Sequence, residues 1–303
     1  MQEKKTTIRL AVLLAAAALI LGTLCLMFSQ KDVPAAEQTV INVEKPYVNL
    51  PIIMYHGVLP DAGRQGDYVI TPSQLDGDLS YLKRNGYQAV TLDSIIRYCE
   101  GSGDLPEKPV LITFDDGQLN NLTYALPLLE KYDFRAAFSI VGGYTEAACE
   151  EAEPSPAYSY LDTEDLKKLI SSGRAEIVNH SYNMHELDER RGALQRPDES
   201  YRDYRRALLN DISAAQRFFK RQLGTEPAVY AYPYGLVCPA ARTVLQMLGF
   251  KASLGCEEKP NHLIKGSTSA LEELHRFNRP SSMSTEDFMR KALADTPETA
   301  LDN

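Results

Sequence analysis

From residue 50 onward, short apolar runs alternate with segments of helical periodicity, and this alternation constrains the fold more than any other feature. The predicted strands are 110–115, 135–140, 175–179, 228–232 and 251–255. The predicted helices between them are 118–132, 162–170, 203–223 and 239–248. Repeated strand–helix units favour parallel strands covered by helices, in a barrel or in an open sheet. In either fold, functional groups collect at the carboxyl ends of the strands.

An earlier helix has a strong start signal. Thr71 is a good N-cap, Pro72 then occupies the first helical position, and Gln74 can complete a capping box. Leucines at 75, 79 and 82 continue the helical spacing. A helix is therefore predicted to begin at Thr71 and to stop at Asn85 and Gly86.

The N-terminus has the composition of a membrane anchor. Residues 10–29 carry no charge, and Lys4, Lys5 and Arg9 precede them. This length is about that of a bilayer span, and the basic flank predicts a cytoplasmic tail with the remaining chain outside. A cleaved signal peptide, which would give a secreted protein, is the alternative, but residues 22–28 offer no small-x-small cleavage site.

We therefore predict a single-pass protein of the cell membrane whose folded domain is extracellular. Its predicted parts are a cytoplasmic tail at 1–9, a transmembrane anchor at 10–29, a stalk at 30–48, a folded domain at 49–290 and a C-terminal tail at 291–303.

Charge and cysteine usage narrow the partners and the chemistry. The net charge is −9, from 32 basic and 41 acidic residues, which argues against nucleic acid as a partner. Acidic residues interleave the arginine-rich stretch 190–206, which is interpreted as a solvated face. Four cysteines follow the anchor and permit disulfides, although a domain of this size does not need them. They are Cys99, Cys149, Cys238 and Cys256.

Two predicted strand ends carry acidic residues and histidines. Asp115 and Asp116 end one predicted strand, and Gly117 gives the backbone the freedom to turn both acids toward one site. His180 and His185 follow another strand. One carboxylate and two imidazoles make a three-ligand site with a position left open for water. The second carboxylate is then available as a general base, which completes the residue set of a metal-assisted hydrolase.

Three further segments lie at predicted strand ends. The turn Tyr232–Gly235 offers a backbone N–H, at Tyr234, that could stabilise an oxyanion, although such turns are also common in loops. His56 follows an apolar run and could act as an acid, or it could be a buried structural histidine. The segment 275–279 is either the last strand reaching the site, with a guanidinium that orients a carboxylate, or a surface ion-pair segment.

Taken together, these motifs resemble the polysaccharide deacetylase family, the NodB-homology domain of carbohydrate esterase family 4. The matching pieces are Thr113–Gly117, the two histidines at 180 and 185, and Tyr232–Gly235, within about residues 49–290. The resemblance implies a distorted (β/α) barrel that uses one divalent metal to remove acetyl groups from N-acetylated sugars. Zinc is the first choice, and cobalt, nickel and iron suit the same ligands.

The resemblance also implies roles for individual residues. Asp115 would be the base and Tyr234 the oxyanion donor. Asp116, His180 and His185 would be the metal ligands. Tyr232 and Pro233 belong to the same motif and are expected to orient the substrate.

Departures from the family pattern point to one branch. Many members have an arginine where this chain has Ala231, and Arg276 or Arg279 is expected to replace it. The opening segment 53–58 resembles the branch that deacetylates poly-N-acetylglucosamine, in which an early histidine is the acid. His56 is therefore the predicted acid, with His275 second. The alternatives are a peptidoglycan N-deacetylase, an inactive membrane-anchored glycan-binding module, and an amidase that acts on a non-sugar amide.

Overall fold

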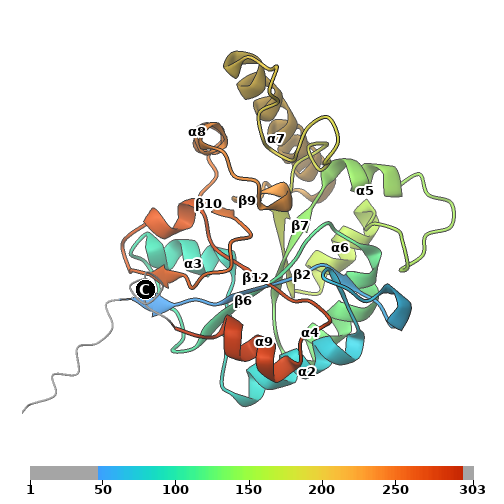
Figure 1. Cartoon of the computed structure of the whole chain (residues 1–303), viewed down its shortest axis with the longest axis vertical. Coiled ribbons are helices and arrows are strands. Elements are labelled where there is room, and N and C mark those ends of the chain that lie inside the picture. Colours follow the sequence, from blue (N-terminus) through green and yellow to red (C-terminus); the bar gives the residue numbers. More distant parts are fainter. Residues whose placement is uncertain (1–46, 296–303) are drawn as a thin grey trace, which may run out of the picture. The chain divides into compact units, whose positions relative to one another are not determined.

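A curled sheet of parallel strands organises the residues that the computed structural model describes, 47–295 (Figure 1). The strand order is β10-β9-β8-β7-β6-β2-β12, with β5 beside β6. The bounds are β2 Ile52–Tyr55, β5 Gln88–Ala89, β6 Pro109–Phe114, β7 Ala136–Ile140, β8 Ala175–Asn179, β9 Val229–Ala231, β10 Ala252–Leu254 and β12 Phe277–Asn278. The predicted anchor at 10–29 and most of the stalk lie outside the described residues.

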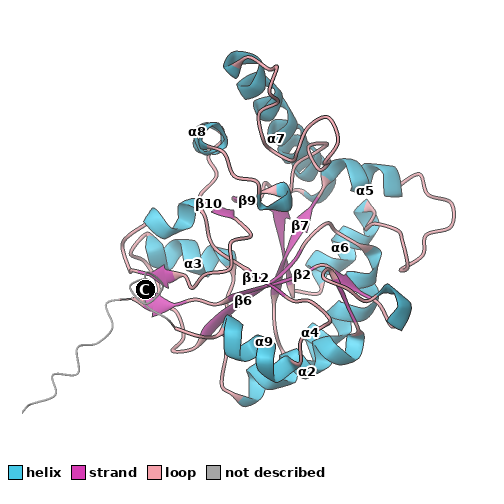
Figure 2. Cartoon of the chain, viewed as in Figure 1, coloured by secondary structure: helices cyan, strands magenta, loops and turns pink. Residues whose placement is uncertain are grey.

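Helices surround these strands (Figure 2). They are α2 Pro72–Arg84, α3 Leu92–Cys99, α4 Leu126–Tyr132, α5 Gly142–Ala148, α6 Thr163–Ser171, α7 Tyr201–Leu223, α8 Pro239–Met247 and α9 Thr285–Ala292. Short helical turns are η1 Ala62–Arg64, η2 Asn121–Ala125, η3 Pro233–Gly235 and η4 Ser269–Glu272. Two-stranded pairs join β1 Val48–Asn49 to β11 His262–Leu263, and β3 Gly57–Val58 to β4 Val69–Ile70.

The alternation predicted from the sequence is confirmed, with element ends displaced by a few residues at most. The predicted helix 118–132 is divided, because a wide turn at Asn121–Ala125 precedes α4. Helices α3, α5 and α9 were not predicted, and each has only seven or eight residues. Such short segments carry too few turns to establish a periodicity.

The core lies on both faces of the sheet. Ile53, Ile112 and Phe138 pack on one face with leucines of α2 and α4, whereas their chain neighbours Ile52 and Leu111 belong to the cluster on the other face. Successive strand residues point to opposite faces, and both faces are covered. The strands therefore appear in the sequence as continuous apolar runs.

The described residues give two further results. Their four cysteines are free thiols, so the disulfides that the sequence permitted are not formed. Among residues 47–295, no helix is long and apolar enough to cross a bilayer.

Removing the Thr71 hydroxyl should destabilise α2. The Thr71 side chain accepts from the Gln74 N–H at 3.1 Å, and the Gln74 side chain accepts from the Thr71 N–H at 3.0 Å. Thr71→Ala should therefore lower the free energy of unfolding by about 1 kcal/mol, measured by urea denaturation. Thr71→Ser keeps the hydroxyl and is the matched control. Equal stability of the two variants would contradict the predicted role of the cap.

Candidate active site

One pocket lies where the central strands end, and it collects most of the predicted site residues. Its volume is about 430 Å³. The lining residues are Met54, His56, Tyr68, Asp115, Asp116, His180, His185, Leu187, Tyr234, Cys256, Glu258 and Asn278. The carboxyl ends of β2, β6, β8 and β9 converge here, as parallel α/β sheets require.

Local backbone geometry turns the pocket residues inward. Asp116 has φ 72° and is followed by Gly117, also at φ 72°, so the chain reverses directly after Asp115. Ser181, next to His180, has φ 74°, and Tyr234 has φ 58°. These are three of the four non-glycine residues with positive φ between residues 47 and 295. Unfavourable backbone conformations tend to cluster at functional sites.

Asp116, His180 and His185 form a group that could hold a metal ion. Their potential ligand atoms lie within 4.8 Å of one another. Asp116 Oδ1 is 3.2 Å from His185 Nε2 and 3.7 Å from His180 Nε2. One carboxylate and two imidazoles are ligands that zinc and similar divalent ions accept.

The surroundings of His180 fit that role. Its Nδ1 lies 2.9 Å from the Ala231 carbonyl oxygen, and because a carbonyl can only accept, Nδ1 carries the proton. Nε2 therefore presents its lone pair toward Asp116 and His185. Burial lowers the pKa of the imidazole to about 4, so His180 is neutral at pH 7. A neutral ring held through its other nitrogen is the form in which histidine binds metals.

Asp115 is buried and paired with Arg276. The guanidinium Nη1 donates to Asp115 Oδ1 at 2.8 Å, and its Nε donates to the Gly255 carbonyl at 2.8 Å. Burial by itself would raise the pKa of the Asp115 carboxyl, but the charge of the Arg276 guanidinium and its hydrogen bond outweigh burial and hold the pKa well below its usual range. Asp115 is therefore ionised at neutral pH and can accept a proton.

Arg276 and Arg279, the two arginines considered for the position beside Asp115, have different surroundings. Arg276 lies beside Asp115, one residue before β12. Arg279 instead forms a fully buried pair with Asp78 at 2.8 Å and donates to the Met283 carbonyl, which links α2 to the segment before α9. Of these two arginines, only Arg276 contacts a residue that lines the pocket, Asp115.

The two histidines considered as acids are also separated. His56 follows β2 and lines the pocket, with its ring edge-on to Tyr68 at a centroid distance of 4.9 Å. Its buried Nδ1 has no hydrogen-bond partner among the described residues. His275 is not one of the lining residues, and its Nδ1 lies 3.7 Å from a Glu257 carboxylate oxygen. Of the two, His56 faces the space that a substrate would enter.

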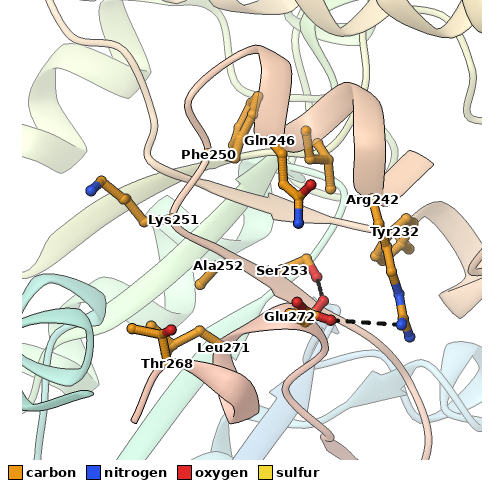
Figure 3. A pocket seen from close by; sticks show the side chains of 11 residues that line it. Tyr232, Arg242, Gln246, Phe250, Lys251, Ala252, Ser253, Thr268, Leu271 and Glu272 are labelled. Carbon is orange, nitrogen blue, oxygen red and sulfur yellow. Dashed lines mark hydrogen bonds and ion pairs between the residues drawn. The ribbon is translucent and has the colours of Figure 1, made fainter. Parts of the chain in front are cut away.

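The segment Tyr232–Gly235 divides between two cavities. The Tyr234 side chain lines the pocket, and its hydroxyl is 3.3 Å from His185 Nδ1. The Tyr232 side chain is fully buried and lines a separate cavity of about 170 Å³ with Arg242 and Ser253 (Figure 3). The substrate-orienting role expected for the Tyr232 side chain therefore does not match its position. Pro233 is the first residue of the turn η3 and is buried.

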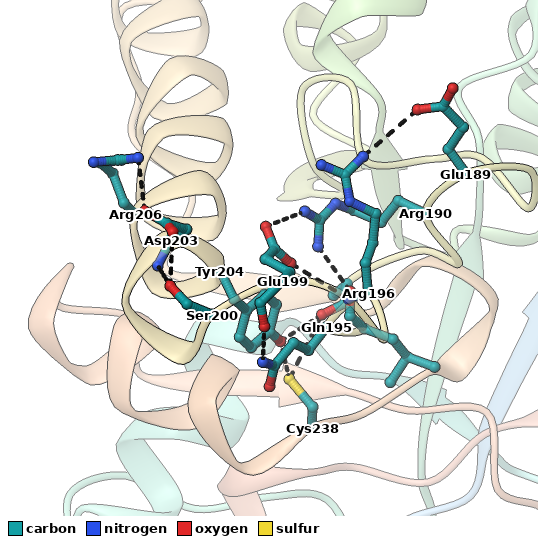
Figure 4. A network of polar contacts seen from close by, with 12 residues as sticks. Glu189, Arg190, Gln195, Arg196, Glu199, Ser200, Asp203, Tyr204, Arg206 and Cys238 are labelled. Atoms are coloured by element: carbon teal, nitrogen blue, oxygen red, sulfur yellow. Dashed lines mark hydrogen bonds and ion pairs between the residues drawn. The ribbon is translucent and has the colours of Figure 1, made fainter.

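A loop over 186–199 borders the pocket through Leu187, its one residue in the pocket lining. Gly192 lets this loop approach the motif, because a Cβ there would lie 2.8 Å from the Pro233 carbonyl oxygen. Arg190 donates to Glu199 at 2.7 Å, and both side chains are 7% exposed (Figure 4). The interpretation of 190–206 as a solvated face was thus wrong at Arg190, whose pairing with Glu199 stabilises the loop.

Comparison with known proteins agrees with this geometry. The family model for polysaccharide deacetylase matches residues 102–253, half of the chain. The chain is 24% identical over 260 residues to poly-β-1,6-N-acetyl-D-glucosamine N-deacetylase of Escherichia coli K12. This match covers 78% of this chain and 39% of the Escherichia coli protein. The chain is also 24% identical over 194 residues to the protein of the same name from Staphylococcus aureus MRSA252. This match covers 64% of this chain and 63% of the Staphylococcus aureus protein.

A solved structure shows the same arrangement of elements. IcaB from Ammonifex degensii superposes with a TM-score of 0.65 at 25% identity, and the match covers 81% of this chain and 96% of that one. The chain spans less than two thirds of the length of the two curated relatives above. The match to the family model and the arrangement of the pocket together lead to one conclusion: this chain belongs to the polysaccharide deacetylase family.

Proposed function

We propose that this protein is a metal-dependent hydrolase that removes N-acetyl groups from a polysaccharide containing N-acetylglucosamine. The observation that carries the proposal is the ionised, arginine-paired Asp115 beside the group Asp116, His180 and His185 in one pocket. The relatives named as poly-β-1,6-N-acetyl-D-glucosamine N-deacetylases support the choice of substrate.

Asp116, His180 and His185 would hold the ion, and zinc is the proposed metal. A divalent ion at such a site polarises the acetamide carbonyl and lowers the pKa of a bound water. These three side chains fit a divalent ion, because His180 is neutral, its Nδ1 donates to a backbone carbonyl, and the Asp116 carboxylate completes the group.

The other residues supply proton transfer and orientation. Asp115 accepts a proton from the attacking water, while Arg276 holds the carboxylate in place. The water oxygen adds to the acetyl carbon, and the Tyr234 backbone N–H is proposed to stabilise the resulting oxyanion. His56 donates a proton to the amine as the C–N bond breaks, so the products are acetate and a glucosamine unit.

The two end strands of the curled sheet, β10 and β12, are connected. The segment before β12 bridges to β10, since the Leu274 N–H donates to the Ser253 carbonyl at 2.8 Å, and β12 itself pairs with β2. This segment therefore reaches both ends of the sheet. We propose that it closes the sheet into the distorted (β/α) barrel of the family.

We propose that the enzyme acts at the cell surface. The uncharged residues 10–29, preceded by Lys4, Lys5 and Arg9, are the basis for a membrane anchor with the catalytic domain outside. Detection of the full-length protein in washed membranes would support this location. A shortened protein found only in the medium would instead identify the segment as a cleaved signal peptide.

Acetate release tests the enzymatic proposal. Soluble oligomers of β-1,6-linked N-acetylglucosamine should yield acetate, a chelator should abolish the reaction, and added zinc or cobalt should restore it. Release from purified peptidoglycan alone would favour the alternative substrate. No release from either substrate by protein that has bound metal and oligomer would favour a glycan-binding module.

A further inference from the structure

We propose that Tyr144 is a positioning residue for His185, and that α5 places the Tyr144 hydroxyl beside the His185 ring. The inference rests on the proposed metal site and deepens it. It follows from contacts between α5 and the loop that carries both histidines.

Helix α5 docks on this histidine loop through its first two residues. The Gly142 N–H donates to the Ser181 carbonyl at 3.0 Å, and the Gly143 N–H donates to the Tyr182 carbonyl at 2.9 Å. These amides begin the helix and have no acceptor within it, so the loop satisfies them. The same two bonds fix the backbone between His180 and His185.

Only glycine permits such a close approach. A Cβ at Gly142 would lie 2.6 Å from a ring carbon of Tyr182, and one at Gly143 would lie 2.7 Å from the Tyr182 carbonyl oxygen. Either side chain would push α5 away from the loop. The pair of glycines therefore sets the distance from α5 to the histidines, and with it the position of the next residue, Tyr144.

Tyr144 contacts His185 at two points. The Tyr144 hydroxyl donates to the His185 carbonyl oxygen at 2.9 Å. The phenol oxygen of Tyr144 is also 3.3 Å from His185 Nδ1. Because the hydroxyl proton is engaged by the carbonyl, the phenol oxygen can accept from an Nδ1–H. The proton then stays on Nδ1, and Nε2 directs its lone pair toward Asp116, which is 3.2 Å away.

Both histidines are thus held in the same way. His180 directs Nδ1 to the Ala231 carbonyl, and His185 directs Nδ1 to the Tyr144 phenol. Tyr234 also places its hydroxyl 3.3 Å from His185 Nδ1, but its side chain is one of the exposed ones. Tyr144 is less exposed, and its ring packs on Tyr160 at a centroid distance of 4.4 Å. The hydrogen bond from the Tyr144 hydroxyl to the His185 carbonyl further restricts the movement of Tyr144.

Cobalt binding to the full-length protein tests the proposal without measuring activity. Co²⁺ is titrated into metal-free protein and followed by its visible absorption. Tyr144→Phe keeps the ring and removes only the hydroxyl, so its Co²⁺ affinity should be about 10–100-fold weaker than that of the wild type. Tyr160→Phe removes a hydroxyl from the other ring of the same pair and should bind Co²⁺ with unchanged affinity.

A second variant and a stability measurement separate positioning from folding. Gly143→Ala keeps the Tyr144 hydroxyl but displaces α5, and it should also weaken Co²⁺ binding. The melting temperature of metal-free Tyr144→Phe should match that of Tyr160→Phe. Wild-type affinity in Tyr144→Phe, or equally weakened binding in Tyr160→Phe, would overturn the proposal for Tyr144. Failure of the wild-type protein to bind Co²⁺ would instead overturn the proposed metal site.

Discussion

Replacing Asp115 with asparagine should lower kcat by about 10²–10⁴-fold, the usual contribution of a general base. The amide oxygen can still accept from Arg276, so the local geometry is retained, but the amide nitrogen cannot take a proton from water. The measurement is the initial rate of acetate release from soluble oligomers at saturating substrate. Bound metal is quantified in the same samples and should be unchanged, since Asp116 and the two histidines remain.

Two controls make this prediction specific. Asp76→Asn removes a carboxylate that pairs with Lys131 and Tyr132 on the surface and should leave kcat unchanged. Urea denaturation of Asp115→Asn corrects the rate for any loss of folded protein, because Arg276 then faces a neutral partner in a buried site. An Asp115→Asn enzyme with the wild-type kcat would exclude this carboxylate as the base.

His56→Ala should lower kcat to a similar extent, by about 10²–10⁴-fold, because the departing amine then lacks its proton donor. The ring lines the pocket and its buried Nδ1 lacks a partner among the described residues, so the substitution breaks no hydrogen bond of that side chain that we observe. Metal content should remain at the wild-type level. Rates are measured on the same oligomers.

His275→Ala is the matched control for His56→Ala. His275 comes from the other candidate segment, does not line the pocket, and lies near Glu257 instead. It should retain the wild-type kcat. The reverse pattern, with an active His56→Ala enzyme and an inactive His275→Ala enzyme, would transfer the role of acid to His275.

The sequence was sufficient to predict the alternating elements and most of the residues that converge on the pocket. Asp115, Asp116, His180 and Tyr234 were found because strand ends in an α/β fold meet at one edge. His56 follows the same logic after β2. These predictions needed only the positions of residues relative to the nearest strand.

Other features depend on contacts between distant segments. The pairing of Asp115 with Arg276 joins residues 161 positions apart, so the sequence offered two arginines and could not choose between them. Arg190 was assigned to a solvated face because the neighbouring charges suggested one, whereas its burial depends on how loop 186–199 folds over the Tyr234 turn. Strand alternation could not have separated Tyr232 from Tyr234, because residues two apart share a face only while the strand continues, and β9 ends at Ala231.

The role of Tyr144 was missed for a related reason. Its helix has only seven residues and begins with two glycines, which are poor helix formers. The signal that could have found it is the pair of glycines directly after a buried strand, because such a pair often marks a close approach of two backbones. That approach here is to the histidine loop.

The placement of Arg276 also has a consequence for biosynthesis. The guanidinium that pairs with Asp115 belongs to a residue 161 positions later in the sequence. A polypeptide still being translated or exported has already made its carboxylates and imidazoles but lacks this cation. Under the proposed function, the arginine-paired carboxylate would therefore form only after residue 276 has emerged, and the nascent protein would lack this pair until then.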